Sequence, residues 1–207
     1  MLSEAAQAAR GMKLLLVIVA LLYVGSYLAG WYLVSVKSPI AVEASLGLQE
    51  SVLTQQPFTS ILQSLQGGEL VKAILLTFLV NLTVGAFLTT TLPGIVPLVG
   101  SLGTIIVTIL RGFVIGIVYP EILSLSFGGF ILGFGTLILE LGAYIFSGAA
   151  GINIALAPIM PKRYGVLSRW AAFRVAWRDA LKIYVIVAIL LVLGAVWEMT
   201  GLFVALR

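Results

Sequence analysis

Long runs of apolar residues, separated by short polar stretches, dominate this chain. One run covers residues 14–36 without a charge, and another covers residues 73–110. At a helical rise of about 1.5 Å per residue, about 20 apolar residues cross the hydrocarbon core of a bilayer, so the second run holds two crossings. The Pro93-Gly94 pair divides this run, because proline and glycine together end a helix and turn the chain.

The pattern predicts five membrane spans, at residues 14–36, 70–91, 95–119, 127–157 and 183–203. Between the first two lies a more polar loop, residues 37–69, in which Phe58, Ile61 and Leu65 recur at helical spacing and predict a short amphipathic helix. We therefore expect one all-α domain. It is a polytopic membrane helix bundle of about five transmembrane helices with amphipathic interfacial helices.

Composition narrows the classes of function. Apolar residues make up 61% of the chain and charged residues only 10%, against roughly a quarter in soluble domains. The chain has no cysteine and no histidine, so the usual residues of thiol chemistry, zinc catalysis and serine–histidine hydrolysis are missing. It also has no basic tract on a polar background, so nucleic acid is not an expected partner. We expect a protein of the cell membrane that is not an enzyme and needs no cofactor or metal.

Basic residues gather in two places that five crossings bring to the same side of the membrane. Arg10 and Lys13 precede the first span, and residues 162–182 contain six more cations. Because Lys and Arg in short loops stay in the cytoplasm, the amino terminus is predicted to be cytoplasmic. The loop at residues 37–69 and the carboxyl terminus then lie outside.

Residues 163–182 are predicted to form an amphipathic helix on the cytoplasmic surface. Its aromatic side chains follow one face at steps of three and four, and its arginines fall mostly elsewhere around the helix. An anchor in the headgroup layer accounts for this pattern, and a docking surface for a cytoplasmic partner is the alternative. The candidate contact residues are Arg169, Trp170, Phe173, Arg174, Trp177 and Arg178.

Two charged residues lie inside the predicted spans, Arg111 in the third and Glu140 in the fourth. Counted from the cytoplasmic ends of these spans, both lie at a similar depth. Each charge alone would cost about 2.5 to 3.5 kcal/mol near the bilayer centre, so we expect the two to pair. The pair is either an ion pair that sets the register of two helices or a proton, ion or substrate site. Asn81, within the second span, is expected to join this polar cluster by hydrogen bonding across helices.

Small residues mark the places where helices are expected to approach closely. In lipid there is no hydrophobic gain from joining two apolar helices, so close backbone approach drives their packing. The contacts are either within one chain or between two copies, so other membrane proteins or a homo-oligomer remain possible partners. The candidate packing residues are Gly112, Gly116, Gly142, Gly148 and Gly151.

The order of these features resembles the stage II sporulation protein M family, from about residue 70 to the end. The matching segments are Asn81, the Pro93-Gly94 turn, Arg111-Gly112-Phe113-Val114-Ile115-Gly116, Leu139-Glu140-Leu141-Gly142-Ala143 and Ser147-Gly148-Ala149-Ala150-Gly151-Ile152. The family typically has Asn-Gly where this chain has Arg111-Gly112, and Pro-His-Gly where it has Gly135-Thr136-Leu137. Its glutamate matches Glu140. These departures suggest a rebuilt cluster in which Arg111 becomes the partner of Glu140.

The resemblance implies a non-enzymatic membrane scaffold or complex subunit that recruits partner proteins. The rival interpretation is a transporter or channel for ions or small solutes. Its site would be Arg111 with Glu140 near the bilayer midplane.

Overall fold

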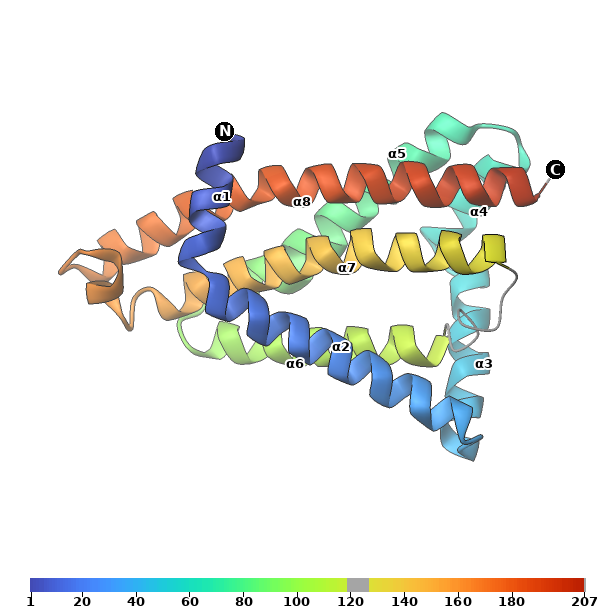
Figure 1. Ribbon diagram of the computed structural model, residues 1–207, viewed down its shortest axis with the longest axis horizontal. Coiled ribbons are helices and arrows are strands. Elements are labelled where there is room, and N and C mark those ends of the chain that lie inside the picture. The colour runs from blue at the N-terminus through green and yellow to red at the C-terminus, as the bar shows by residue number, and fades with distance from the viewer. Residues whose placement is uncertain (119–126, 207) are drawn as a thin grey trace.

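The computed structural model describes residues 1–118 and 127–206. Within these ranges every regular element is a helix, and five of the helices are long and apolar enough to cross a membrane. The long helices run roughly along one axis, with the carboxyl end of the chain at one end of the bundle (Figure 1). The predicted all-α membrane bundle is confirmed.

The five spans lie close to the predicted positions. They are α2 (Lys13–Ser35), the run Leu70–Ile95, α6 (Val99–Val118), α7 (Phe127–Leu156) and α8 (Arg169–Ala205). The run Leu70–Ile95 consists of α5 (Leu70–Val80), the π-helix η1 (Asn81–Thr91) and the 3₁₀ turn η2 (Leu92–Ile95).

The turn at Pro93 and Gly94 is absorbed into the second span, so the third span begins at Val99 rather than at residue 95. Both α6 and α7 are continuous over their described residues. Position 119, where the third span was predicted to end, lies outside the described residues.

The predicted amphipathic helix at residues 163–182 is not a separate element. Helix α8 begins at Arg169, where the Ser168 side chain caps it by accepting from the Ala171 amide over 3.4 Å. It then continues for 37 residues into the fifth span. No proline or glycine stands between the amphipathic stretch and the apolar stretch, so nothing in the local sequence ends the helix there. At 1.5 Å per residue α8 is about 55 Å long, against about 30 Å for the hydrocarbon core.

The amino-terminal helix α1 (Leu2–Gly11) lies across α8 at the end of the bundle where α7 and α8 are joined (Figure 1). Small residues permit this crossing, because Ala5 and Ala8 of α1 are buried, as are Ala172 and Ala176 of α8. The Arg163 guanidinium also donates to the Gly11 carbonyl over 3.3 Å. The amino terminus and the basic segment therefore share one end.

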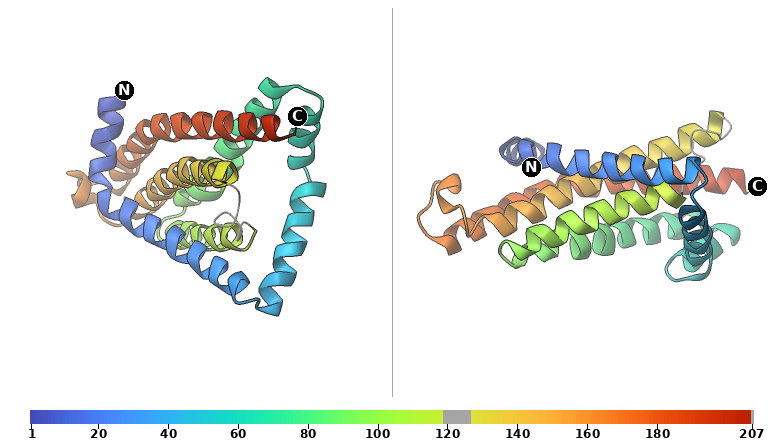
Figure 2. Two further views of the ribbon diagram at one scale, coloured as in Figure 1. Left: turned by 45° about the vertical axis from the view of Figure 1, so that its right-hand side comes forward. Right: turned by 90° about the horizontal axis from the view of Figure 1, so that it is seen from below.

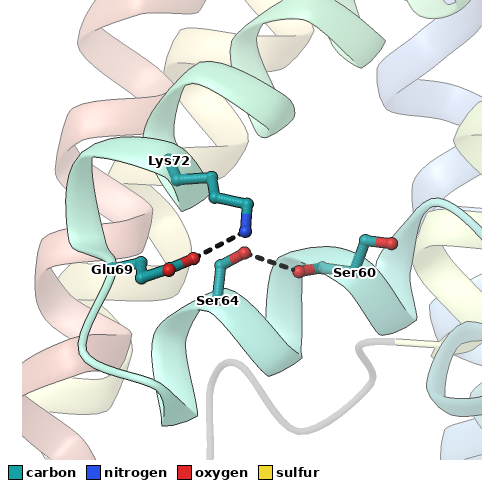
Figure 3. Close-up of polar contacts among 4 residues, drawn as sticks. All are labelled: Ser60, Ser64, Glu69 and Lys72. Carbon is teal, nitrogen blue, oxygen red and sulfur yellow. Dashed lines mark hydrogen bonds and ion pairs between the residues drawn. The ribbon is translucent and has the colours of Figure 1, made fainter.

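The loop between the first two spans is helical. Helix α3 (Pro39–Thr54), which the sequence pattern did not predict, crosses the opposite end of the bundle (Figure 2). Helix α4 (Phe58–Gln66) corresponds to the predicted amphipathic helix, and its Ile61 and Leu65 are buried beside Ala73 and Met199. On either side of its corner with α5 lie two local bonds: within α4, Ser64 donates to the Ser60 carbonyl over 2.8 Å, and at the start of α5, Lys72 pairs with Glu69 at 2.6 Å (Figure 3).

Candidate functional site

The centre of the second span is a π-helix, η1, which covers 11 residues. Long π-helices are rare, and short ones often lie at functional sites. Several of its hydroxyl groups bond back to carbonyls of the preceding turn, for example Thr89 to Gly85 over 2.8 Å and Thr90 to Ala86 over 2.5 Å. Such bonds are known to bend helices. Asn81, Gly85 and Thr89 follow one another at intervals of four residues and contact the neighbouring helices.

Arg111 of α6 is held by neutral groups of η1. Its guanidinium donates to the Gly85 carbonyl over 2.8 Å and to the Thr89 hydroxyl over 2.7 Å, and it lies 4.3 Å from the centre of the Tyr144 ring. Tyr23 of α2 is also close to this arginine, fully buried, and its hydroxyl lacks a hydrogen-bond partner among the described residues. The positive charge is thus stabilised by a carbonyl, a hydroxyl and an aromatic face.

Glu140 of α7 accepts a hydrogen bond of 2.6 Å from the amide of Asn81. The expected ion pair with Arg111 is not formed, since no carboxylate oxygen of Glu140 lies within 4.0 Å of the guanidinium. Both residues contact the second span, but Arg111 contacts it at Gly85 and Thr89, one to two turns beyond Asn81. Similar depth in the bilayer therefore did not bring the two charges together.

Glu198 of α8 lies near Glu140. A Cβ atom at Gly194 would lie 3.5 Å from Cγ of Glu140, and Trp197 donates to the Leu132 carbonyl over 3.1 Å. This register puts Glu198 one helical turn from Glu140. A cavity of about 290 Å³ opens beside them. Its lining residues are Ile115, Gly129, Leu132, Gly133, Thr136, Leu137, Glu140, Leu141, Tyr144, Glu198 and Leu202.

A second polar layer fixes η1 against its neighbours. Thr90 and Ser147 share a hydrogen bond of 2.8 Å, and Thr91 donates to the Ser147 carbonyl over 3.0 Å. Tyr184 of α8 donates to Thr91 over 2.8 Å, and Thr104 of α6 donates to the Thr90 carbonyl over 2.9 Å. Three helices thus meet η1 through hydroxyl groups. The run Thr89-Thr90-Thr91 is a sequence signal for this layer.

The glycines singled out for packing contact helices of the same chain. Cβ atoms at Gly112 and Gly116 would collide with α2 at Ser26 and Tyr27, so α2 and α6 approach backbone to backbone. One at Gly151 would collide with the Thr90 carbonyl of η1.

Two of these glycines have more room. A Cβ atom at Gly142 would lie 3.5 Å from Leu190, which is an ordinary contact distance. One at Gly148 would lie 3.3 Å from Val19, which is a tight contact but not a collision.

The predicted contact residues at the amino-terminal end of α8 face in two directions. Phe173 and Trp177 are half-buried against the core, whereas Trp170 is 62% exposed. Trp170 stacks on Phe173 at 5.3 Å and has the Arg174 guanidinium 6.0 Å from its ring. The exposed cations at this end of the bundle are Arg10, Lys13, Lys162, Arg163, Arg169, Arg174 and Arg178.

The comparison with protein families gives one finding. The family model described as Stage II sporulation protein M matches residues 5–200 of the 207 residues. No similarity to a curated protein or to a solved structure is found. The match covers nearly all of the chain, whereas the resemblance in sequence covers about residue 70 to the end, with the first span also in the expected place. The chain belongs to the stage II sporulation protein M family.

Proposed function

We propose that this protein is a non-enzymatic membrane scaffold or complex subunit that recruits partner proteins at its basic end. The observation that carries the proposal is the length of α8. Its 37 residues make a rod of about 55 Å, longer than the roughly 40 to 45 Å of a whole bilayer with its headgroups. The amino-terminal turns of α8 thus have the length to extend beyond the lipid, where partner proteins would find them.

The basic platform, defined here as α1, the 3₁₀ turn η4 (Pro161–Tyr164) and residues 169–182, suits docking because it is held in place. Tyr164 donates to the Asn153 side chain over 2.7 Å, and Lys182 pairs with Asp179 at 3.2 Å. Burial raises the pKa of the Tyr164 hydroxyl, so it stays protonated and keeps donating. A surface that is already ordered loses little conformational entropy when a partner binds.

The exposed groups of the platform indicate a partner with an acidic surface. Arg169, Arg174 and Arg178 are exposed beside Trp170, and arginine and tryptophan are enriched in protein interfaces. The positive-inside rule places the platform in the cytoplasm and leaves α3, α4 and the carboxyl terminus outside. Negative charge on the partner would complement the platform and speed association.

Capture of partners from native membranes tests the proposal. The wild-type protein, purified gently, should bring a defined set of proteins with it. Reversing two platform charges, Arg169→Glu with Arg174→Glu, should remove that set. Two reversals at the other end, Lys37→Glu with Lys72→Glu, should retain it.

Loss of the same proteins from both double variants would contradict recruitment at the platform. A flux measurement addresses the rival function, because a scaffold passes no solute in proteoliposomes. Flux that disappears with Glu140→Gln would identify a carrier instead.

A further inference from the structure

The cavity between α6, α7 and α8 combines a mainly apolar wall with two carboxyl groups. We propose that it binds a small monovalent organic cation, namely a protonated amine attached to an apolar body. Five of its lining residues are leucine or isoleucine, and its volume of about 290 Å³ is at the small end of ligand sites. This proposal concerns binding alone and is independent of the scaffold role.

Glu198 and Glu140 differ in their bonding. Glu140 has the amide of Asn81 as a partner, but Glu198 forms no hydrogen bond and no ion pair with a described residue. Both carboxyl groups line the cavity, Glu140 from the fourth span and Glu198 from the fifth. A polar group in the membrane without a partner is costly, so such groups usually mark a site.

Tyr144 of α7 is a further polar residue of this cavity. It lines the same cavity, and its hydroxyl oxygen lies beside Gly85 of η1 without a hydrogen bond to a described residue. Its ring is already engaged by Arg111, which leaves the hydroxyl as its free polar group. An ammonium group in the cavity can donate to the carboxylates of Glu140 and Glu198.

The balance of charge sets the charge of the ligand. The groups that act on the site are Arg111 from α6, Asn81 from η1, Glu140 and Tyr144 from α7, and Glu198 from α8. One cation and two carboxyl groups leave the site one positive charge short when both carboxyls are ionised. A ligand with a single positive charge would stabilise the ionised form of both carboxyl groups.

The apolar wall favours an organic cation over a metal ion. A metal ion needs several oxygen ligands around it, and the remaining wall is supplied mostly by aliphatic side chains and glycine. A lipid headgroup amine fits less well, because its own phosphate would bring another negative charge next to the carboxylates. Of these three ligands, a free amine fits the cavity best.

Calorimetric titration of the purified protein in a maltoside detergent with hexylammonium chloride tests the proposal. We expect saturable binding of one hexylammonium per protein and no comparable binding of the neutral analogue 1-hexanol. Glu198→Gln should weaken the binding at least tenfold. The control Glu43→Gln removes an exposed carboxylate of α3 and should leave the binding unchanged.

Glu140→Gln should also weaken the binding, but its loss of charge affects the bond with Asn81 as well. Glu198→Gln is therefore the deciding variant, because Glu198 has no bond to lose. Equal binding of 1-hexanol, unchanged binding by the Glu198 variant, or no binding by the wild type would each overturn the proposal.

Discussion

The amide of Asn81 donates a hydrogen bond of 2.6 Å to the carboxylate of Glu140, across 59 residues of sequence. The arginine of the same polar core contacts the second span at other residues, Gly85 and Thr89. The two buried charges therefore meet neutral groups of one helix rather than each other. The second span, with its π-helical middle, is the element that organises the polar core.

Replacing Asn81 with leucine should lower the free energy of unfolding by about 1 to 2 kcal/mol, because it leaves the Glu140 carboxyl without its donor. Unfolding in detergent, followed by circular dichroism, measures the loss. The control is Thr83→Val in the same span, since Thr83 is exposed and its hydroxyl donates to the Leu79 carbonyl of the preceding turn. Equal losses for the two variants would show that the bond to Glu140 contributes nothing.

A pair of double-mutant cycles distinguishes the partners of Arg111. Coupling between Arg111→Met and Thr89→Val should be about 0.5 to 1.5 kcal/mol, because the two side chains are in direct contact. Coupling between Arg111→Met and Glu140→Gln should be smaller. A larger coupling energy in the second cycle would indicate a direct ion pair between Arg111 and Glu140.

Gly116→Ala should destabilise the fold by about 1 to 3 kcal/mol, because the added methyl group would collide with the backbone of α2 at Tyr27. Gly25→Ala is the matched control, since a Cβ atom there meets nothing within 4 Å. Thermal unfolding of both variants in one detergent gives the comparison. A Gly116 variant as stable as the Gly25 variant would argue against close packing of α2 on α6.

The orientation can be tested with single cysteines, because the chain contains none of its own. Ser3→Cys and Ser168→Cys should react with an impermeant maleimide only from the cytoplasmic side. Gln55→Cys, in the loop between α3 and α4, should react only from outside; all three positions are exposed. Labelling of Ser3→Cys and Ser168→Cys from opposite sides would be incompatible with a shared end.

The arrangement of spans could be predicted because it depends on length and on the absence of charge. Uncharged apolar runs such as residues 14–36 are too long and too apolar for the surface of a soluble protein, so they predict membrane spans. The Pro93-Gly94 pair predicts a turn. The positions of Gly112 and Gly116 on one face of α6 follow from their four-residue spacing, although the identity of their partner helix does not.

The contacts of the polar core could not be predicted in the same way. Counting residues gives the depth of Arg111 and Glu140 but not the direction in which each side chain turns around its helix. The π-helix also changes which residues of the second span face Arg111 and Glu140, because its wider turns shift every later residue of that span. The position of Glu198 beside Glu140 could not be predicted for a related reason, since it depends on how α8 is aligned along α7 through Gly194 and Trp197.

The most direct test of the scaffold role is photo-crosslinking in native membranes from position 170. Trp170 is 62% exposed at the platform, and Leu75, 53% exposed within the second span, supplies a control position in contact with lipid. A photoreactive amino acid in place of Trp170 should give discrete adducts with one or a few proteins, and in place of Leu75 it should give adducts with lipid. Adducts with lipid alone from position 170 would contradict recruitment and identify this end of α8 as a membrane anchor.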